Sequence, residues 1–321
     1  MGPLVAIGGV SIAVIDRKLP FCGIQSWVDE VERALDGRLC SLEDAEIVLF
    51  PEAKIASRNA QVIESLLSES KLLVTGFHGL HAPLSRFQNL QEALLARANR
   101  LWATRRESAP VPVDVELPYI PFSAPLRPVQ GSTDVVLMTG RLTTAKGQVH
   151  LAHVADRLRG RVVLAGNSNM SYDRALWLHL ERGVPLTSRR ALPLHEAPRA
   201  NEPWTVGKVT CEGRYANVWE VFARIRPRVH VNLTSRRFSP GHLEYATLEA
   251  LAAGIRCVVP EHAVEGLDYA LGDSLVTVDE TDEDALADAL NACLAREHPP
   301  RDTPAILELH DPAAYVERLL G

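Results

Sequence analysis

Apolar runs and amphipathic segments alternate along the first part of the chain. Short apolar runs at residues 1–14, 47–50 and 72–74 predict buried strands. Between them, residues 24–35 and 59–67 carry apolar side chains three and four positions apart, which predicts helices. Strands and helices that alternate in this way form parallel sheets with right-handed crossovers, so the pattern predicts an α/β domain.

The alternation resumes at residue 134 and continues towards the C-terminus. Further apolar runs predict strands at residues 134–138, 161–165, 229–233 and 257–259. The segments between and after these runs predict helices at residues 150–158, 171–182, 244–253, 283–296 and 312–320. We therefore predict two doubly wound, Rossmann-like domains that face a central cleft at the carboxyl ends of their strands.

A proline-rich stretch, residues 108–131, separates the two series. Proline removes a backbone donor and fixes φ, so this stretch predicts an extended linker rather than a core element. We place an N-terminal domain at residues 1–125 and a C-terminal domain at residues 126–305. Residues 306–321 are expected to form a C-terminal helix that can pack back on the N-terminal domain.

The composition is that of a packed globular protein. Hydrophobic residues make up 46% of the 321 positions and charged residues 23%, which argues against global disorder. The formal net charge of −6 argues against a generally basic coat for nucleic acid, but it leaves room for a local basic groove. The five scattered cysteines form no CxxC pair, and the N-terminal apolar run is too short for a signal sequence or a membrane span. We expect a soluble, cytoplasmic monomer with reduced thiols.

Two cations follow the strand predicted at residues 134–138. Arg141 and Lys146 lie in the glycine-bounded segment 140–147, which opens the next helix. A diphosphate there can accept amide hydrogens while the two cations neutralise its charge. The same cations would stabilise a departing nucleoside diphosphate, which gains negative charge in the transition state. An exposed helix with ordinary surface cations explains the segment equally well.

A glutamate near the start of a later helix suggests a second contact. The carboxylate of Glu249 offers about four lone-pair sites, so it can accept hydrogens from both ribose hydroxyls. For an isolated glutamate in this position, a favourable interaction with the helix dipole is the commoner explanation, and it also applies to Glu244.

Together these segments resemble the C-terminal domain of the retaining GT-B glycosyltransferases. The similarity rests on residues 140–147, 181–185 and 243–249 and on Gly254, which agree with the family motifs in order and approximate spacing. Within that fold the segments are most similar to those of the T-even phage DNA α-glucosyltransferase. The resemblance covers roughly residues 135–260, and the first half of the chain is only faintly similar.

The resemblance implies a donor site and a donor. By this resemblance Gly140, Arg141 and Lys146 hold the diphosphate, the two cations also act in catalysis, and Glu249 holds the ribose. Glu244 and Tyr245 are expected at the same donor site. The implied donor is a UDP-sugar, most simply UDP-glucose, and the family needs no obligatory metal.

One departure from the family pattern concerns the sugar contact. Retaining members carry a glutamate eight positions before the ribose-binding one, and here that position is Gly241. The contact with the donor sugar is therefore left to Glu244 or to backbone amides.

The first domain offers two candidates. Gly23 precedes a predicted helix and would permit a loop to approach the donor phosphates, although an ordinary turn explains it equally well. His78 follows the strand at 72–74 and is our candidate for contacting the donor sugar or moving a proton. Gly79 stands where the phage enzyme has an aspartate, so that carboxylate is missing.

Clusters of arginine raise the question of a DNA acceptor. The candidate DNA-binding residues are Arg105, Arg106, Arg189, Arg190, Arg236 and Arg237. Each cluster taken alone is better explained as a solvated face. The resemblance, rather than the charge, implies double-stranded DNA with hydroxymethylated pyrimidines such as 5-hydroxymethylcytosine, and a nucleotide flipped into the site.

The predicted function is therefore retaining transfer of a sugar to hydroxymethylated bacteriophage DNA, in the host cytoplasm if a phage encodes the protein. Two alternatives remain open. The protein can be a GT-B glycosyltransferase for a metabolite, lipid or glycan acceptor, or a non-catalytic module that binds nucleotide-sugar or nucleic acid.

Overall fold

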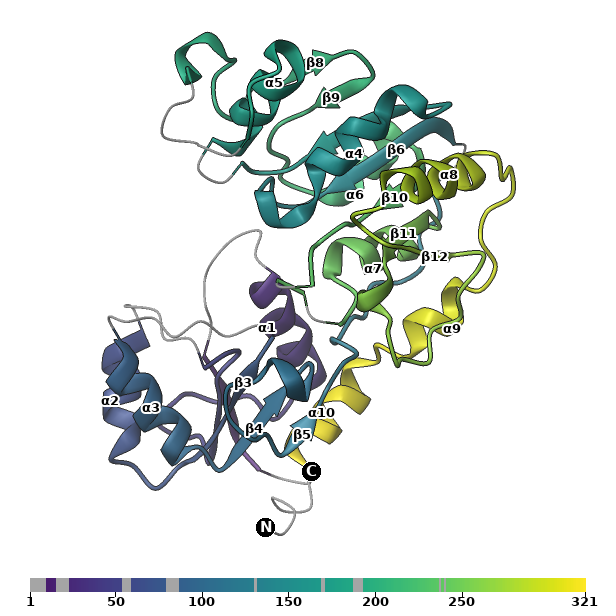
Figure 1. The fold of residues 1–321 in the computed structure, drawn as a ribbon. Coiled ribbons are helices and arrows are strands. Elements are labelled where there is room, and N and C mark those ends of the chain that lie inside the picture. The colour runs from purple at the N-terminus through teal and green to yellow at the C-terminus, as the bar shows by residue number, and fades with distance from the viewer. Residues whose placement is uncertain are drawn as a thin grey trace. The chain divides into compact units, whose positions relative to one another are not determined.

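The computed structural model describes residues 10–15, 23–53, 59–78, 87–129, 132–168, 171–186, 193–236, 238–239 and 241–321. The chain divides into two compact units (Figure 1). Unit 1 comprises Met1–Ser123, Arg237–Tyr245 and Glu308–Gly321, and unit 2 comprises Ala124–Arg236 and Ala246–Leu307. Among the described residues, no helix has both the length and the apolar character needed to cross a membrane.

Unit 1 contains a parallel sheet of five strands in sequential order. The strands are β1 (Ile12–Val14), β2 (Ile47–Leu49), β3 (Leu72–Phe77), β4 (Arg100–Ala103) and β5 (Val115–Glu116). The helices that accompany them are α1 (Gly23–Ala34), α2 (Ala60–Leu67), α3 (Gln88–Arg97) and, from the C-terminus, α10 (Pro312–Leu320). Helices α1, α2 and α10 and strands β2 and β3 lie where the apolar pattern predicts them, which confirms the α/β class for this part of the chain. Of the strand expected at residues 1–14, β1 covers Ile12–Val14, and residues 1–9 lie outside the described residues. No strand was predicted at β5, which lies in the proline-rich stretch.

An aromatic cluster holds unit 1 together. The rings of Trp27 and Trp102 stack with centroids 5.5 Å apart, and both side chains are fully buried. Trp27 Nε1 donates a hydrogen bond of 2.9 Å to the hydroxyl of Tyr315 in α10. The C-terminal helix therefore packs on α1 inside unit 1, because its aromatic side chain completes this core.

The proline-rich stretch is extended, as its composition predicts, but part of it belongs to the core. Val113, Leu117, Ile120 and Phe122 are all buried, and unit 1 continues to Ser123. The prolines keep most of this stretch out of the sheet. Of the four, Leu117 packs in the cluster that contains Trp27 and Trp102, and Val113 packs with Phe77 and Ala103. The expectation of a linker outside the core was therefore wrong for these four residues.

Unit 2 contains a sheet of seven strands whose order reverses. The strands are β6 (Thr133–Thr139), β7 (Arg161–Ala165), β8 (Trp204–Val206), β9 (Val209–Cys211), β10 (Pro227–Val231), β11 (Arg256–Pro260) and β12 (Leu275–Val278). Their spatial order is β12-β11-β10-β6-β7-β9-β8, and only the β8–β9 pair is antiparallel. The chain leaves β6 in one direction and returns as β10 on the other side of β6. This reversal is a topological switch point, where doubly wound proteins bind ligands at the carboxyl ends of the strands.

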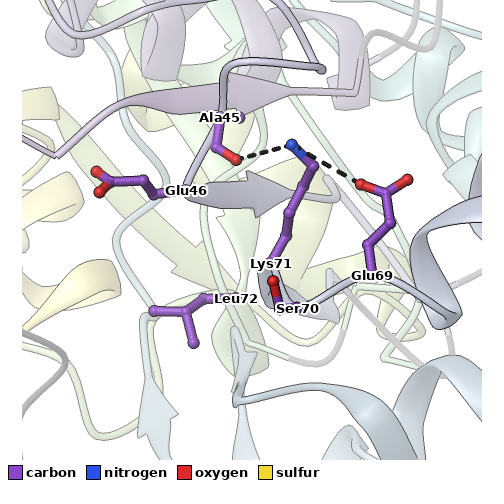
Figure 2. Close-up of a pocket in the computed structure, with 6 residues that line it drawn as sticks. All are labelled: Ala45, Glu46, Glu69, Ser70, Lys71 and Leu72. Carbon is purple, nitrogen blue, oxygen red and sulfur yellow. Dashed lines mark hydrogen bonds and ion pairs between the residues drawn. The ribbon is translucent and has the colours of Figure 1, made fainter.

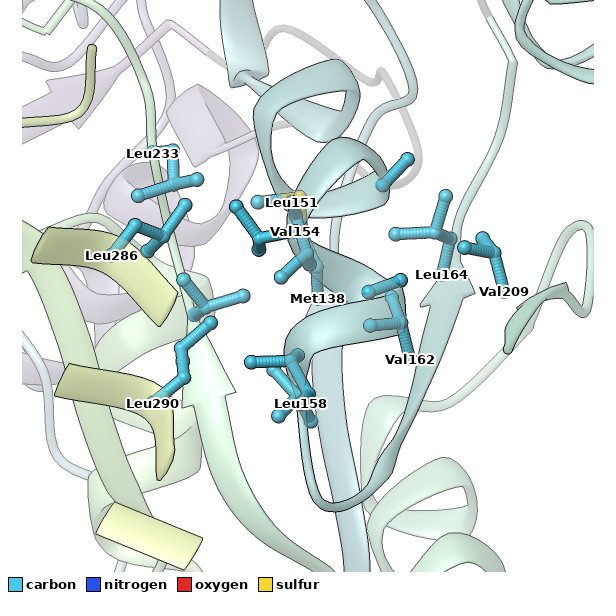
Figure 3. Packing of buried hydrophobic residues seen from close by; sticks show 14 of the residues in the cluster. Met138, Leu151, Val154, Leu158, Val162, Leu164, Val209, Leu233, Leu286 and Leu290 are labelled. Atoms are coloured by element: carbon cyan, nitrogen blue, oxygen red, sulfur yellow. The ribbon is translucent and has the colours of Figure 1, made fainter. Parts of the chain in front are cut away.

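Helices pack on the sheet of unit 2 around a large apolar core. They are α4 (Gln148–Val154), α5 (Tyr172–Arg182), α6 (Val218–Ile225), α7 (Tyr245–Ala252), α8 (Glu283–Leu294) and α9 (Thr303–Glu308). In Figure 3, Leu286 and Leu290 of α8 approach the side chains of β6 and α4, including Met138 and Leu151. This shared core fixes the positions of α4 and α8 relative to the strand ends.

Candidate active site

The carboxyl ends of β6 and β7 touch through their backbones. A β-carbon on Gly166, just after β7, would lie only 1.6 Å from the carbonyl oxygen of Gly140. Gly140 itself has φ +111°, in the region that favours glycine. Both residues must therefore be glycine, and the loop after β6 starts from a fixed position.

The rest of this loop is equally constrained. A short 3-10 turn, Thr144–Lys146, is capped by the Thr143 hydroxyl, which accepts the amide hydrogen of Ala145 at 3.0 Å. Gly147 follows with φ +70°, and a β-carbon there would lie 2.6 Å from Cβ of Leu233. The sequence predicted that a helix opens in segment 140–147; the structure places this turn first and starts α4 at Gln148.

The two predicted phosphate-binding cations lie on this loop. Arg141 is exposed, and Lys146 is half-buried. The carbonyl oxygen of Arg141 accepts a hydrogen bond of 3.1 Å from Nε2 of Gln148, a residue that is 1% exposed. The backbone of Arg141 is thus held from inside the protein while its guanidinium group faces solvent.

Glu249 of α7 lies near the same strand ends. Burial raises the pKa of Glu249 to about 7, because a desolvated carboxylate is less stable than its neutral form. Burial, followed by the charge of Glu249, also raises the pKa of Tyr215, while hydrogen bonds with the Gly140 backbone and the Thr139 side chain oppose this shift. Glu249, Tyr215 and the end of β6 therefore form one polar group at the switch point.

Sequence reasoning missed Tyr215 and its support. Tyr215 lies in the loop after β9, and a single tyrosine in a polar loop has no periodic signal. Next to it, the Thr139 hydroxyl lies 2.9 Å from Nε2 of the fully buried His230. His230 lies between the buried Val229 and Val231 of β10, so a histidine within an apolar run was the one available signal.

The loop after β10 is tied to the loop after β6. The amide of Ser235 donates to the carbonyl oxygen of Ala145 at 3.0 Å. Asn232 accepts hydrogen bonds from the amide and the hydroxyl of Thr234 at 2.9 and 2.7 Å. The two loops of the switch point are therefore connected by a main-chain hydrogen bond, and the second loop is braced by Asn232.

Three predicted donor-site residues belong to unit 1. Gly23 is the first residue of α1, and a β-carbon there would make an ordinary contact of 3.6 Å with the Tyr245 ring. The hydroxyl of Tyr245 donates to the carbonyl oxygen of Pro121 at 2.9 Å, so Tyr245 anchors this segment within unit 1. Glu244, the preceding residue, is half-buried.

Gly241, where the resemblance would place a glutamate, has little space for a side chain. Gly241 has φ +132°, and a β-carbon there would lie 2.6 Å from Nε of Arg105. Arg105 instead donates from Nε to the Gly241 carbonyl oxygen at 2.8 Å. The position therefore has no space for a side chain unless Arg105 moves.

His78 lies at the end of β3 as expected, but within an aromatic environment. Its ring meets the rings of Trp102 and Trp27 edge to face, at centroid distances of 4.7 and 5.6 Å. The hydroxyl of Thr104 donates to its carbonyl oxygen at 3.0 Å. The imidazole is thus held in one orientation by packing.

The predicted DNA-binding arginines differ in exposure. The Arg105 side chain is 11% exposed and also forms an ion pair with Glu116, so it acts inside unit 1. Arg106 is exposed, and its guanidinium donates to the carbonyl oxygen of Val113 at 2.8 Å. Arg236 is 63% exposed and pairs with Glu265 at 2.7 Å. The remaining three candidates, Arg189, Arg190 and Arg237, lie outside the described residues.

A surface pocket in unit 1 lies at the amino ends of the strands, away from the ends where ligands of such sheets bind (Figure 2). It is lined by Ala45, Glu46, Glu69, Ser70, Lys71 and Leu72, and so lies at the amino ends of β2 and β3. Lys71 Nζ donates to the carbonyl oxygens of Glu43 and Ala45 at 2.7 and 3.0 Å. Ligands of α/β sheets bind at the opposite, carboxyl ends.

Comparisons with known proteins identify the fold. No protein-family model matches the chain, and no curated protein is similar to it in sequence. Among solved structures, Anabaena HepE in complex with UDP and glucose is 13% identical with a TM-score of 0.70, over 97% of this chain and 98% of that chain. An α-glucosyltransferase in complex with UDP and a mismatched 13-mer DNA is 17% identical with a TM-score of 0.58, over 98% and 95%. AviGT4, a glycosyltransferase involved in avilamycin A biosynthesis, is 14% identical with a TM-score of 0.61, over 97% of both chains.

These similarities extend over nearly the whole chain and over both parallel sheets. The chain therefore has the GT-B fold, as the sequence predicted. At these identities the similarity defines the fold and leaves the activity to be argued from the site.

Proposed function

We propose that the protein is a retaining glycosyltransferase that transfers glucose from UDP-glucose to a hydroxymethylated pyrimidine in double-stranded DNA. The observation that carries the proposal is the polar group at the switch point of unit 2. There, an exposed cation, Arg141, and a half-buried carboxylate, Glu249, lie near the same strand ends. Their complementary chemistry fits a diphosphate joined to a ribose.

The proposed roles follow from charge and position. Arg141 and Lys146 bind the diphosphate and stabilise the negative charge that grows on it as the glycosidic bond breaks. Glu249 accepts hydrogen bonds from the ribose hydroxyls, and Tyr215, which is hydrogen-bonded to the Gly140 backbone and the Thr139 side chain, lies close to it. The departing phosphate accepts the proton of the acceptor hydroxyl, so the protein needs to supply orientation rather than a strong base.

In unit 1 we propose that His78 contacts the donor sugar or the acceptor. Its fixed imidazole at the carboxyl end of β3 supports this role, because parallel sheets place binding residues there. Gly241 and Arg105 exclude a carboxylate from the position that the family uses. We therefore assign the sugar contact to Glu244 and to backbone amides.

The choice of DNA as acceptor is supported by the similarity of segments 140–147, 181–185 and 243–249 to those of phage DNA α-glucosyltransferase. It is also supported by the structural neighbour solved with UDP and DNA. Arg106 and Arg236, both exposed, are the described residues that we assign to DNA phosphates.

A second candidate is a glycosyltransferase for a non-DNA acceptor. HepE superimposes with a higher TM-score than the DNA enzyme, and the neighbours include a lipopolysaccharide outer core galactosyltransferase, WaaB. The overall negative charge of the chain, −6, also favours an acceptor without a polyanionic backbone.

Nucleoside mass spectrometry separates the two candidates. The protein is incubated with UDP-glucose and one of three duplexes, which carry 5-hydroxymethylcytosine, 5-hydroxymethyluracil or only unmodified bases. Glucosylated nucleoside from one modified duplex, and none from the unmodified duplex, is the expected result. UDP release without any glucosylated nucleoside in all three reactions would contradict the DNA acceptor. It would leave the proposed use of UDP-glucose standing.

A further inference from the structure

A row of polar side chains lies at the carboxyl ends of β12, β11 and β10 in unit 2. These strands are neighbours in the sheet, and β10 is next to β6, which is followed by the proposed donor loop, residues 140–147 (Figure 1). The row consists of Glu280 after β12, His262 in the short turn after β11 and Thr234 after β10. His262 and Thr234 are buried, and the side chain of Glu280 is 19% exposed.

His262 contacts the other two members of the row. Its Nε2 lies 3.0 Å from the carbonyl oxygen of Thr234, and its Nδ1 lies 3.5 Å from Oε2 of Glu280. A carbonyl oxygen only accepts hydrogen bonds, so Nε2 donates to Thr234 whether the ring is neutral or charged. The imidazole therefore holds the loop after β10 from the turn that follows β11.

Every polar group of Thr234 is hydrogen-bonded. Its amide and its hydroxyl donate to Oδ1 of Asn232 at 2.9 and 2.7 Å, and its carbonyl oxygen accepts from His262. Asn232 in turn donates its amide hydrogen to the carbonyl oxygen of Val258 in β11 at 3.0 Å. A buried polar network costs free energy unless its members are paired, and a fully paired network favours a single conformation. His262 thus helps to fix the backbone of the loop after β10.

The loop after β10 supports the donor loop directly. The amide of Ser235 donates to the carbonyl oxygen of Ala145 at 3.0 Å. A β-carbon on Gly147 would lie only 2.7 Å from the carbonyl oxygen of Leu233, so these two backbones are in close contact. Ala145 and Gly147 are the neighbours of Lys146 in the sequence. The backbone on both sides of this cation therefore rests on the loop that His262 holds.

We propose that His262 is a positioning residue for the donor diphosphate. It acts through Thr234 and Ser235 on the backbone beside Lys146 and does not touch the ligand. This inference rests on the proposed function, because it takes the donor loop as the diphosphate site. A loop that already has its binding conformation loses less conformational entropy when the ligand binds, so a fixed loop binds more tightly.

A matched pair of variants tests the hydrogen bond to Thr234. The amide nitrogen of glutamine can take the place of Nε2, whereas that of the shorter asparagine can take only the place of Nδ1. By calorimetry, His262→Gln should bind UDP nearly as tightly as the wild type. His262→Asn should weaken UDP binding by about 10–100-fold, because small displacements of binding groups have effects of this size.

Uridine distinguishes a positioning role from general damage to the fold. It has the base and ribose of UDP but lacks the diphosphate, so the donor loop does not contribute to its binding. His262→Asn should therefore bind uridine as the wild type does, although its binding of UDP is weakened. His195→Asn is the control, because this side chain is 82% exposed and belongs to the same unit. It should bind both ligands as the wild type does.

Glu280→Ala gives a second, milder test that decides the matter if His262→Asn does not fold. It removes the partner of Nδ1 and leaves the donor to Thr234 in place. UDP binding should weaken by about two- to fivefold, the usual contribution of a partly exposed ion pair, and uridine binding should stay the same.

Two results with these variants would overturn the proposal. Equal weakening of UDP and uridine binding would show that His262 serves the fold alone. Unchanged UDP binding would show that the donor loop keeps its conformation without His262. A wild type that does not bind UDP at all would instead contradict the proposed function, and the role of His262 with it.

Discussion

The two units share an architecture but present their candidate chemistry differently. In unit 2, Gly140, Gly147 and Gly166 allow backbones to approach at the strand ends, and Arg141 remains exposed. In unit 1, His78 packs against two tryptophans and Arg105 is bonded to Gly241. The first arrangement leaves polar groups available to a ligand, whereas the second also uses its polar side chains to hold the fold.

This difference determines how each unit has to be tested. A variant in the loop after β6 removes a functional group at little structural cost. A variant at His78 or Arg105 removes packing or a buried hydrogen bond at the same time. Loss of activity is therefore direct evidence in unit 2, while in unit 1 it requires a variant that preserves packing.

The largest effect is expected at Lys146. Lys146→Ala should lower kcat by about 10²–10³-fold, because the transition state loses one of the charges that stabilise the departing diphosphate. The measurement is steady-state turnover of UDP-glucose with the acceptor that the mass spectrometry identifies. Arg157→Ala, whose side chain is 44% exposed and lies outside the motif segments, is the control and should keep wild-type turnover. Normal turnover by Lys146→Ala would contradict the diphosphate-binding role that we assign to Lys146.

The next effect compares a glycine from each unit. Gly166→Ala should lower the free energy of unfolding by about 3 kcal/mol or more, because its β-carbon meets the Gly140 carbonyl and the core cannot relax without strain. Gly23→Ala should change it by less than about 1 kcal/mol, because its β-carbon makes only an ordinary contact. Chemical denaturation measures both. Equal stability of the two variants would show that the strand ends of unit 2 are not fixed by backbone contact.

A variant at His78 distinguishes a packing role from a chemical role in unit 1. His78→Phe keeps an aromatic ring against the stacked rings of Trp27 and Trp102, so the Tm should stay close to that of the wild type. If the imidazole acts in transfer, turnover should still fall by about a hundredfold. Wild-type turnover with an unchanged Tm would assign His78 to packing alone.

The smallest effect is the pH dependence of donor binding. With the pKa of Glu249 at about 7, the carboxyl group is mostly neutral at pH 6 and mostly ionised at pH 8. Ribose hydroxyls donate to the ionised form, so UDP should bind about tenfold more tightly at pH 8 than at pH 6. In Glu249→Gln this dependence should disappear, leaving only the contribution of the UDP phosphates. Calorimetry at the two pH values gives the answer, and an identical pH dependence in both proteins would exclude the ribose role.

The sequence predicted the long, apolar elements well. The strand expected at residues 161–165 has the same bounds as β7, because a short run with two adjacent valines favours a buried strand. The hairpin of β8 and β9 was missed, since each strand has three residues and little periodicity. The buried part of the proline-rich stretch was also missed, because proline content predicts an extended backbone and does not predict burial.

The candidate site was predicted in part. Three of the candidates could be found in local sequence segments. Arg141 and Lys146 lie between Gly140 and Gly147, and Glu249 lies near the start of a predicted helix. Tyr215 and Gly166 are brought to the same strand ends by the tertiary fold, so no local pattern identifies them. For the same reason, sequence reasoning could not show that Arg105 fills the space next to Gly241.

The most direct test of the account is a crystal structure of the protein with UDP. The account predicts the diphosphate against Arg141 and Lys146 and the ribose hydroxyls within hydrogen-bond distance of Glu249. UDP bound elsewhere, with these three side chains in contact only with solvent, would contradict it.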